Sequence, residues 1–359
     1  MIICRTPFRI SFFGGGTDYP DWYRAHGGAV LATTIDKYCY LTCRYLPPFF
    51  EHRIRVVYRK IETCRTIDEV THPSVRETLR FLKIDGGVEL HHDGDLPARS
   101  GMGSSSAFTV SLLHALHALR GEMVTKSQLA HESIHLEQNV LRETVGSQDQ
   151  VMAAYGGLRH VKFHPSGEMA IDSLILPPSR TAELQSHLLL VYTGIARTAA
   201  DVARSYVSNL EARRRQLRII KELVEESIDI LASGSDIRAF GELLHESWQA
   251  KRSLSSQVSN SEIDDLYARA QQAGALGGKL TGAGGGGFLL LFVEPDRQAD
   301  VLAALPGRIH VPFRFDTAGS QIIFYEPQKE YEPAQRGWES PRPLPFRELV
   351  SSEITAEAS

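Results

Sequence analysis

The sequence predicts an α+β fold organised as two domains. The chain has 359 residues, which at about 150 residues per domain suggests two domains or one large α/β unit. In each half, segments typical of strands come first and helical periodicity follows, whereas a parallel sheet would alternate the two one by one. Hydrophobic residues make up 42% and charged residues 23%, proportions that predict a globular chain with a core.

Strand-type segments dominate the start of the chain. They are rich in β-branched and aromatic residues, and glycine or proline turns separate them. Helical spacing then takes over, with Ala107, Val110 and Leu113 on one apolar stripe. The expected strands are Ile2–Phe13, Ala29–Ile35, Tyr38–Tyr45, Ile54–Tyr58, Val88–His92 and Leu158–Phe163, and the expected helices begin near Ala107 and cover Lys126–Leu141 and Ser147–Tyr155.

The second half repeats this order after a boundary expected at Pro177–Pro178. Ser259 and Glu262 have the spacing of a capping box that opens a helix ending at Gly274. The predicted domains are 1–178 and 179–330, and a proline-rich charged tail covers 331–359. The other expected elements are the strands Leu188–Val191, Phe288–Val293 and Gln321–Tyr325 and the helical stretches Ala199–Leu231, Ile237–Ser253 and Arg297–Leu305.

Charge and hydropathy argue against two classes of partner. The formal net charge is −4, so no basic excess of the whole chain would attract nucleic acid or an anionic membrane. The longest clean apolar run, Phe288–Val293, is far short of the roughly 20 residues of a membrane helix. The N-terminus lacks a signal-peptide pattern. The cysteines, at positions 4, 39, 43 and 64 without CxxC spacing, are typical of reduced core thiols in a cytoplasmic protein.

The stretch PARSGMGSSSA at 97–107 has the composition of a phosphate site. Gly101 and Gly103 let the backbone approach a ligand, and three serines stand where the helical period begins. A helix N-terminus presents free N–H groups and the positive end of its dipole, and a serine there can ligate Mg²⁺. The P-loop pattern GxxxxGK[ST] is absent, so an ordinary serine N-cap after a glycine turn stays open for this stretch alone.

A second glycine-rich stretch, GGKLTGAGGGGF, covers Gly277–Phe288. Its glycine density exceeds what a simple turn needs and indicates close backbone approach or positive φ angles. Gly282, Gly284 and Gly287 match GxGxxG, but a strand follows them where the dinucleotide fingerprint needs a helix, so that match is weak. A flexible surface loop is the alternative.

The segment FRISFFGGGTDYPDWY at 8–23 has features of a sugar site. An apolar strand runs into three glycines and then Thr17, Asp18 and Tyr19. A carboxylate can accept hydrogen bonds from sugar hydroxyls, and an aromatic ring can pack against their C–H faces. A hairpin turn is the alternative reading of the glycines and the aspartate.

Two carboxylates follow on predicted helices. Ile134, Glu137 and Leu141 have i, i+3, i+7 spacing, so Glu137 lies on an apolar face, where a carboxylate must be paired or bind a metal. Asp149 comes twelve residues after Glu137, at the start of another helix. Two carboxylates separated by a turn can converge, one on a metal and one on a reacting hydroxyl, although each alone is also explained by a structural role.

Together these motifs resemble the GHMP kinase superfamily, which includes galactokinase and the homoserine, mevalonate and phosphomevalonate kinases. PARSGMGSSSA is similar to its PxxxGLGSSAA motif, KLTGAGGGGF to its KxxGAGxGG run, and PFRISFFGGGTDYPDWY to the APGRxNLxGEHTDY start of galactokinases. The resemblance covers about residues 5–325. It implies a two-domain fold with a ribosomal-protein-S5-like N-terminal domain and a ferredoxin-like C-terminal domain.

The resemblance also implies roles for residues at matching positions. Asp149 matches the catalytic aspartate and Arg9 the basic residue beside it, while Ser105 and Glu137 match the Mg²⁺ ligands. The implied ATP-binding residues are Pro97, Ser100, Gly101, Met102, Gly103, Ser104, Ser105 and Ser106, and the implied substrate-binding residues are Gly15, Gly16, Thr17, Asp18, Lys37, Arg99, Thr193, Arg197, Gly284 and Gly285.

Within the superfamily, GGGTDYPDWY, TIDKY, GSQDQ and VYTGIAR are similar to the D-glycero-D-manno-heptose 7-phosphate kinases. This implies transfer of the γ-phosphate of ATP, with Mg²⁺, to the anomeric C1 hydroxyl, giving the 1,7-bisphosphate for nucleotide-activated heptose synthesis. Gly15 and Gly16 replace the Glu-His of galactokinases, which argues against galactose, and Arg99 stands where many members carry a small residue.

Two other functions stay open at this point. One is a kinase for L-fucose or another unphosphorylated sugar, and the other is a non-catalytic sugar and nucleotide sensor. The expected partners are ATP and a sugar phosphate, with no nucleic acid and no membrane, and the resemblance also admits a homodimer.

Overall fold

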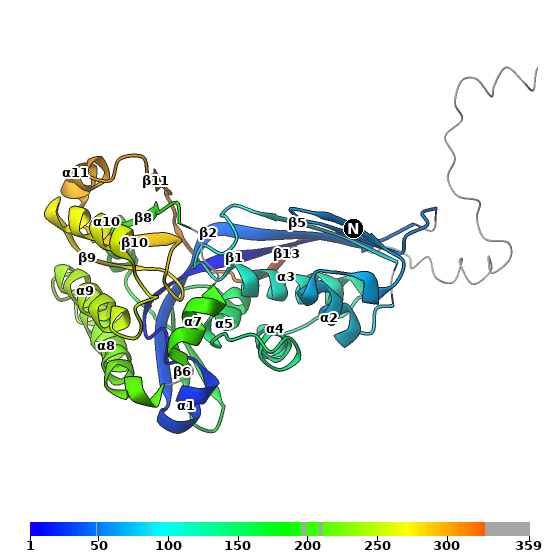
Figure 1. The fold of residues 1–359 in the computed structure, drawn as a ribbon, viewed down its shortest axis with the longest axis horizontal. Helices are drawn as coiled ribbons and strands as arrows, with labels where there is room; N and C mark the ends of the chain where they lie inside the picture. The colour runs from blue at the N-terminus through cyan, green and yellow to red at the C-terminus, as the bar shows by residue number, and fades with distance from the viewer. Residues whose placement is uncertain (48, 86, 196–198, 208–209, 327–359) are drawn as a thin grey trace, which may run out of the picture.

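The computed structural model describes residues 1–47, 49–85, 87–195, 199–207 and 210–326, and its strands form a nine-stranded and a four-stranded sheet with helices packed on them (Figure 1). This confirms the predicted α+β class. Within the described ranges, no helix combines the length and apolar character that crossing a bilayer requires. All four cysteines are buried free thiols. The predicted tail 331–359 lies outside the described residues.

The large sheet is built on two long antiparallel strands, β1 (Ile2–Phe13) and β2 (Gly28–Tyr45). The two strands expected at 29–35 and 38–45 are therefore one strand. The pairing of β1 with β2 shifts register between Pro7 and Arg9. No glycine or proline stands between those two segments to end the ladder, which explains the difference. The sheet order is β13-β1-β2-β5-β3-β4, with β6, β7 and β12 off this path. The other strands are β3 (Ile54–Val57), β4 (Ile61–Cys64), β5 (Val88–Gly94), β6 (Arg159–Phe163), β7 (Met169–Ser173), β12 (Phe315–Asp316) and β13 (Gln321–Tyr325).

Helices α2, α3, α4 and α5 lie on one side of the strands β1, β2 and β5 (Figure 1). Helix α3 begins at Ser104, three residues before the apolar stripe, with Gly103 as its left-handed N-cap. The helix expected at 126–141 is an α-helix to Ile134 and continues as a π-helix to Val140. The helices of this part are α1 (Pro20–His26), η1 (Ile67–Glu69), α2 (Pro73–Phe81), α3 (Ser104–Leu119), α4 (Lys126–Ile134), η2 (His135–Val140) and α5 (Gln148–Tyr155).

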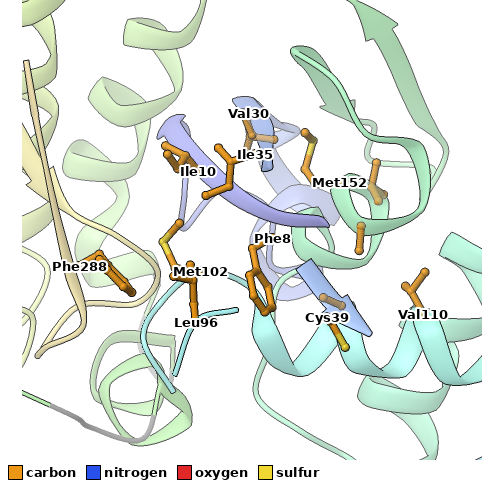
Figure 2. Close-up of a cluster of buried hydrophobic side chains, with 14 of the residues drawn as sticks. Phe8, Ile10, Val30, Ile35, Cys39, Leu96, Met102, Val110, Met152 and Phe288 are labelled. Atoms are coloured by element: carbon orange, nitrogen blue, oxygen red, sulfur yellow. The ribbon is translucent and has the colours of Figure 1, made fainter. Parts of the chain in front are cut away.

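The core reaches the loop that precedes α3. Figure 2 shows Met102 among Ile10, Phe8 and Leu96, with Phe288 of the strand β10 (Phe288–Val293) on its other side. Met102 is fully buried, and burial of such a side chain contributes about 1.5–3 kcal/mol. Its carbonyl also accepts a hydrogen bond from Arg9 N at 3.1 Å. The predicted phosphate loop is therefore anchored to β1 through both side chain and backbone.

The second sheet has the order β11-β8-β10-β9, which is the fourth, first, third and second of its strands along the chain. Helices connect β8 to β9 and β10 to β11, so the element pattern is the β-α-β-β-α-β of ferredoxin-like folds. This confirms the fold expected for the C-terminal half. Its strands are β8 (Leu188–Tyr192), β9 (Ala275–Leu280), β10 (Phe288–Val293) and β11 (Ile309–His310).

The helical stretch expected at 199–231 is divided in the structure into α7, which ends at Val207 and packs Tyr206 against Tyr19, the short η3 and α8, which begins at Arg214. The cap prediction in this half was wrong by one residue. The cap of α10 is Asn260, whose side chain accepts from Ile263 N at 3.0 Å, whereas Ser259 donates to Asp264 instead. The helices are α6 (Pro178–Ser186), α7 (Ala199–Val207), η3 (Glu211–Arg213), α8 (Arg214–Ala232), α9 (Arg238–Arg252), α10 (Ser261–Gln272), η4 (Pro295–Arg297) and α11 (Gln298–Ala303).

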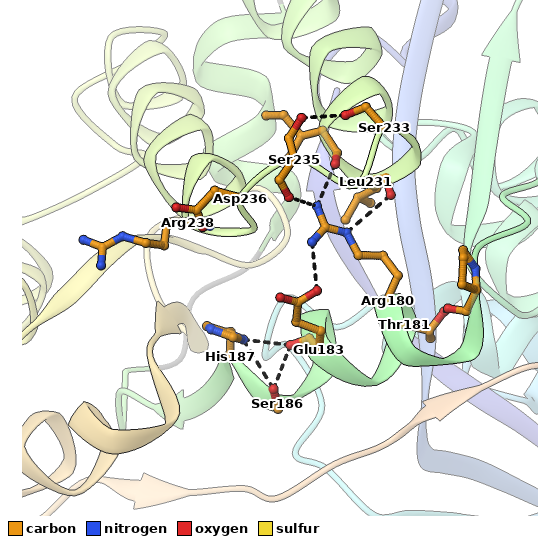
Figure 3. Close-up of polar contacts among 12 residues, drawn as sticks. Arg180, Thr181, Glu183, Ser186, His187, Leu231, Ser233, Ser235, Asp236 and Arg238 are labelled. Carbon is orange, nitrogen blue, oxygen red and sulfur yellow. Dashed lines mark hydrogen bonds and ion pairs between the residues drawn. The ribbon is translucent and has the colours of Figure 1, made fainter.

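A buried arginine ties α6 to the end of α8 (Figure 3). Arg180 Nη2 donates to the carbonyls of Ile230 and Ser235, both at 2.7 Å, and Nη1 pairs with Glu183 at 2.8 Å. The last carbonyls of a helix lack intrahelical donors, so this guanidinium satisfies them. The contact fixes α8 beside the predicted domain boundary.

The end of the described chain returns to the large sheet. Strand β13 pairs with β1, and β12 pairs with β2. A division at residue 178 therefore stays a proposal, since the segment 315–325 adds its strands to the sheet of the first half.

Candidate active site

Arg9 and Asp149 form a two-point ion pair at the centre of the site. Arg9 Nε donates to Asp149 Oδ1 and Nη2 donates to Oδ2, each at 2.7 Å, while Nη1 donates to Gly101 O at 2.7 Å. Arg9 comes from β1 and Asp149 from the first turn of α5. The side chain of Asp149 is 26% exposed against 5% for Arg9, so the carboxylate is held in one orientation but stays accessible.

The loop before α3 lies directly against this pair. Gly103 has a φ of 73°, and a Cβ added there would lie 3.2 Å from Arg9 Cγ and 3.4 Å from Asp149 Oδ2. Because Gly103 is the N-cap, the free N–H groups of α3 begin beside Asp149. The sixteen-residue helix therefore presents an anion site next to a carboxylate.

The two glycine-rich stretches pack backbone to backbone. A Cβ at Gly282 would lie 2.5 Å from Gly101 Cα, and one at Gly287 would lie 2.2 Å from Ser100 O. Phe288 N also donates to Ser100 O, at 3.3 Å. Glycine at these positions is thus required by close approach, and the contact joins the two halves of the chain at the phosphate loop.

Three predicted substrate residues have structural contacts near this junction. Thr193 Oγ1 donates to Gly287 O at 2.8 Å. Gly285 N donates to Val258 O at 2.8 Å, and a Cβ at Gly284 would lie 2.6 Å from the same oxygen. These contacts shape the loop that contains Gly284 and Gly285.

Glu137 is a buried carboxylate with one unpartnered oxygen. Its Oε2 accepts from Ser106 Oγ at 2.8 Å and from Gln150 Nε2 at 2.5 Å, whereas Oε1 is buried and has no hydrogen-bond partner in the described structure. Burial raises the pKa of Glu137 to about 7. Ser105 lies on the same turn as Ser106 and is exposed. The serine in contact with Glu137 is therefore Ser106, one position after the predicted metal ligand.

These groups fit a hard divalent cation. Mg²⁺ is usually held by one or two carboxylates together with substrate phosphates and water. Glu137 Oε1 offers an unused carboxylate oxygen, and the α3 N-terminus offers a phosphate site on the same turn as Ser105. Among the described residues, no three His, Cys, Asp or Glu side chains gather as a self-sufficient metal cage.

Asp18 is held at the end of the Gly14–Gly16 turn. It is 2% exposed, and its carboxylate accepts from Gly16 N at 2.9 Å and Gln148 N at 3.3 Å. Burial raises the pKa of Asp18, and the charge of Asp149 adds to this effect. A Cβ at Gly146 would lie 1.8 Å from Asp18 Oδ2, so the segment before α5 must approach without a side chain.

The glycines of this turn are not equivalent. A Cβ at Gly14 would lie 1.9 Å from Ala29 O, and one at Gly16 would lie 3.3 Å from Leu217 Cδ2. At Gly15 the nearest contacts would be 3.5 Å or longer. Thr17 Oγ1 donates to Gly14 O at 2.8 Å and closes the turn. Of the three glycines, Gly15 is therefore the one where an added Cβ would make only ordinary van der Waals contacts.

The predicted phosphate-binding cations are not gathered at this turn. Arg99 is exposed and has a left-handed φ of 61° at the start of the phosphate loop. Lys37 Nζ contacts Asp36 at 3.3 Å. No hydrogen bond or ion pair in the described structure joins either cation to 14–18, and Arg197 lies outside the described residues.

Sequence reasoning missed two buried lysines. Lys279 Nζ donates to Phe12 O at 2.8 Å, and Lys251 Nζ donates to Gly282 O. Burial lowers the pKa of Lys251 to about 8, with Arg9 adding to the shift, and burial lowers the pKa of Lys279 well below its usual range. Lys279 is visible in sequence as the charge inside a glycine-rich strand. Lys251 lies three residues after the buried Trp248, which was a signal of an inward-facing position.

Comparison with known proteins agrees with this geometry. The N-terminal domain of the GHMP kinases matches residues 70–157, and their C-terminal domain matches residues 214–309. The chain is similar to the D-glycero-alpha-D-manno-heptose 7-phosphate kinase of Campylobacter jejuni, with 26% identity over 84% of this chain and 92% of that protein.

Two further relatives are informative. An L-fucokinase/L-fucose-1-P guanylyltransferase of Bacteroides fragilis is 28% identical over 83% of this chain, which spans 35% of that longer protein. The crystal structure of a D-glycero-D-manno-heptose 1-phosphate kinase from Bacteroides thetaiotaomicron has a TM-score of 0.74 and 23% identity, and covers 89% of this chain and 98% of its own.

Proposed function

Because this chain belongs to the GHMP kinase family and is an ATP-dependent sugar kinase, we propose that its acceptor is D-glycero-D-manno-heptose 7-phosphate. The γ-phosphate of ATP would pass to the anomeric C1 hydroxyl and give the 1,7-bisphosphate. The single observation that carries the reaction type is the Arg9–Asp149 pair against the N-terminus of α3.

That arrangement suits phosphoryl transfer, which depends on positioning and charge stabilisation more than on covalent chemistry. The free N–H groups of α3 would hold the ATP phosphates beside Asp149. Asp149 would orient the sugar hydroxyl and accept its proton. Arg9 would hold both oxygens of Asp149 in place and offset the charge that develops on the transferred phosphoryl group. The nucleotide would lie along Pro97–Ser106.

Ser105 and Glu137 are the proposed Mg²⁺ ligands. Their support is the unpartnered Glu137 Oε1 and the exposed Ser105 hydroxyl on the first turn of α3. When bound, Mg²⁺ would neutralise charge on the ATP phosphates. Ser106 would keep the Glu137 carboxylate oriented through its hydrogen bond to Oε2.

The sugar is proposed to lie between Asp18 and Asp149, because the charge of Asp149 is close enough to help raise the pKa of the buried Asp18 carboxylate. Asp18 would accept hydrogen bonds from sugar hydroxyls, with Gly15, Gly16 and Thr17 forming the wall of the pocket. The 7-phosphate needs a cation beyond those that hold ATP. Arg99 is our first candidate because its guanidinium is exposed at the phosphate loop, and Lys37 and Arg197 are the others.

The proposed acceptor is tested by the ADP released when purified protein is mixed with MgATP and one sugar. Heptose 7-phosphate should be the best of a panel with unphosphorylated heptose, L-fucose and galactose. Equal efficiency with fucose or unphosphorylated heptose would instead support the unphosphorylated-sugar alternative. Binding of ATP and sugar without ADP release for any sugar would support the sensor alternative.

Arg99→Ala refines this test. It should raise the KM for heptose 7-phosphate strongly and leave the KM for ATP nearly unchanged. Arg65→Ala is a control, since it removes an exposed arginine that follows β4 and pairs with Glu51. A rise in the KM for ATP alone would indicate that Arg99 binds the nucleotide and not the phosphate of the sugar.

A further inference from the structure

Lys251 places a buried positive charge in the C-terminal half beside carboxylates of the N-terminal half. Its side chain lies on α9 and is 5% exposed. Its amino group donates to Gly282 O, Gly282 packs on Gly101, and the carbonyl of Gly101 accepts from Arg9. The charges of Arg9, Asp18 and Asp149 are also close enough to act on the pKa of Lys251. A buried ammonium is costly unless paired. This cost is explained if the charge has a task that a neutral side chain could not perform.

The hydrogen bonding of Lys251 leaves donors unused. An ammonium group carries three N–H donors. Within the described part of the chain, Lys251 Nζ has one acceptor, the carbonyl oxygen of Gly282. That contact fixes the amino group at the glycine-rich loop, which packs on Gly101. The remaining donors are free for a ligand at the site where Asp18 and Asp149 act.

We propose that Lys251 donates a hydrogen bond to the attacking sugar oxygen and stabilises the negative charge that develops there. This inference rests on the proposed kinase function, in which the sugar lies between Asp18 and Asp149. In the reaction, the hydroxyl proton moves to Asp149 and an oxygen lone pair forms the new bond to the γ-phosphorus. The bond from that phosphorus to the bridging oxygen breaks, and its electron pair leaves with ADP. Lys251 gives up no proton in this step.

The position is suited to such a role. A preorganised donor aimed at developing charge stabilises the transition state more than the ground state, and removing one such donor typically lowers the rate about 10²–10³-fold. Arg9 uses three of its five N–H donors on Asp149 and Gly101, so its guanidinium is held against the carboxylate. Lys251 and Lys279 are both nearby cations of the opposite half of the chain that keep unused donors, and Lys251 is the one held at the glycine-rich loop that packs on Gly101.

A structural role for Lys251 makes a different prediction. If its task were only to hold Gly282 O, replacement would lower the melting temperature and leave the kinetics of the remaining folded protein unchanged. If its charge serves the reaction, Lys251→Met should keep or raise the melting temperature, because an apolar side chain of similar length avoids the desolvation of a buried charge. The two readings are separated by measuring stability and kinetics on the same variants.

The experiment compares the parent, Lys251→Met, Lys251→Arg and Lys126→Met. Lys126 is a matched control, because its ammonium also donates only to backbone carbonyls, those of Tyr155 and Ala318. We expect Lys251→Met to lower kcat/KM for the sugar about 100-fold, with ATP affinity within about twofold of the parent. Lys251→Arg should recover part of the activity. Lys126→Met should lower the melting temperature without this kinetic loss.

The pH profile supplies a second readout. The charges facing Lys251 are Arg9 on β1, Asp18 on the glycine turn, Asp149 on α5 and Lys279 on β9. A protonated amine is required, so the parent should lose activity as the pH rises past about 8, and Lys251→Arg should move this loss to higher pH.

Each outcome decides one of the two proposals. Unchanged kcat/KM in Lys251→Met, or a kinetic loss fully explained by a lower melting temperature and restored by cooling, would overturn the role of Lys251 and leave the kinase function intact. A parent that releases no ADP with any sugar of the panel would overturn the kinase function and this inference with it. If Lys251→Met does not fold, the activity and the pH profile of Lys251→Arg still test the role of Lys251.

Discussion

Ser106 Oγ donates a hydrogen bond to Glu137 Oε2 across 2.8 Å, joining the first turn of α3 to the π-helical segment His135–Val140. Gln150 of α5 donates to the same oxygen. One carboxylate oxygen is thus saturated and the other is left without a partner in the described structure. This asymmetry is expected for a carboxylate oriented toward a cation, and it leads to the first prediction.

Glu137→Gln should raise the Mg²⁺ concentration needed for half-maximal activity by roughly tenfold or more. The amide oxygen can still accept from Ser106, so the local fold is retained. Because burial raises the pKa of Glu137 to about 7, its ionised form is unfavourable in the metal-free protein above that pH. The melting temperature of Glu137→Gln at pH 8 without metal should therefore equal or exceed that of the parent. An unchanged Mg²⁺ requirement with a lower melting temperature would indicate a structural carboxylate.

Asp149→Asn should reduce turnover by roughly 100-fold or more while nucleotide binding is kept. The amide is a poor proton acceptor, and it offers Arg9 one oxygen in place of two. The measurement is single-turnover ADP formation together with the Kd for ATP. Asp172→Asn, an exposed carboxylate on β7, is the control and should behave like the parent. Near-parental turnover in Asp149→Asn would remove Asp149 from the mechanism.

Gly146→Ala should displace Asp18, because the new methyl group would lie 1.8 Å from its Oδ2. The KM for the sugar should rise and the KM for ATP should change little, since the three atoms nearest to the added methyl group all belong to the Asp18 carboxylate, outside the phosphate loop 97–106. Gly94→Ala is the matched control. The φ of Gly94 is not left-handed, and the atom nearest to the added Cβ would be Leu96 O at 3.6 Å. Equal sugar KM values for both variants would contradict the role of Asp18.

His117→Gln tests a pH-dependent contribution to stability away from the site. The ring nitrogens contact Glu122 at 2.7 Å and Glu132 at 2.8 Å. Burial lowers the pKa of His117, but the hydrogen bonds to Glu132 and Glu122 outweigh it, so the pKa is raised above its ordinary value of 6.5. The stabilisation is fully present below pH 6.5 and is lost as the pH rises through the raised pKa.

The expected loss of unfolding free energy in His117→Gln is therefore about 1.5–3 kcal/mol at pH 6 and smaller at pH 9. Urea unfolding at the two pH values measures it. His131→Gln, which removes an exposed histidine from α4, should show no comparable pH dependence. A deficit of equal size at both pH values would mean that the charge of His117 contributes nothing.

Several features could be predicted from sequence because they depend on local chemistry. Glycines before a serine-rich helix start predict a phosphate loop, and the structure places Gly103 at the N-cap of α3. The apolar helical face predicted that Glu137 would be buried. The capping of α10 was misplaced by one residue, because Asn260 and Ser259 are both good N-cap residues and the local pattern does not rank them.

Other features depend on contacts between distant segments. The pairing of β13 with β1 joins residues more than 300 positions apart, and nothing in either strand specifies its partner. The sequence of α7 likewise does not specify that Tyr206 packs against Tyr19. Periodicity in the sequence indicates that a helix face is apolar, but it does not identify the residues that pack against that face.

The sequence by itself determined the fold class, the two glycine-rich stretches and the residue types needed for phosphoryl transfer, since these follow from periodicity, turn chemistry and helix-end geometry. Only the tertiary structure decided that Ser106 contacts Glu137, that Arg9 holds both oxygens of Asp149, and that Lys251 lies buried near them. The physical reason is that charge–charge and hydrogen-bond energies depend on distance in space and on burial, and both are set when separate elements pack together.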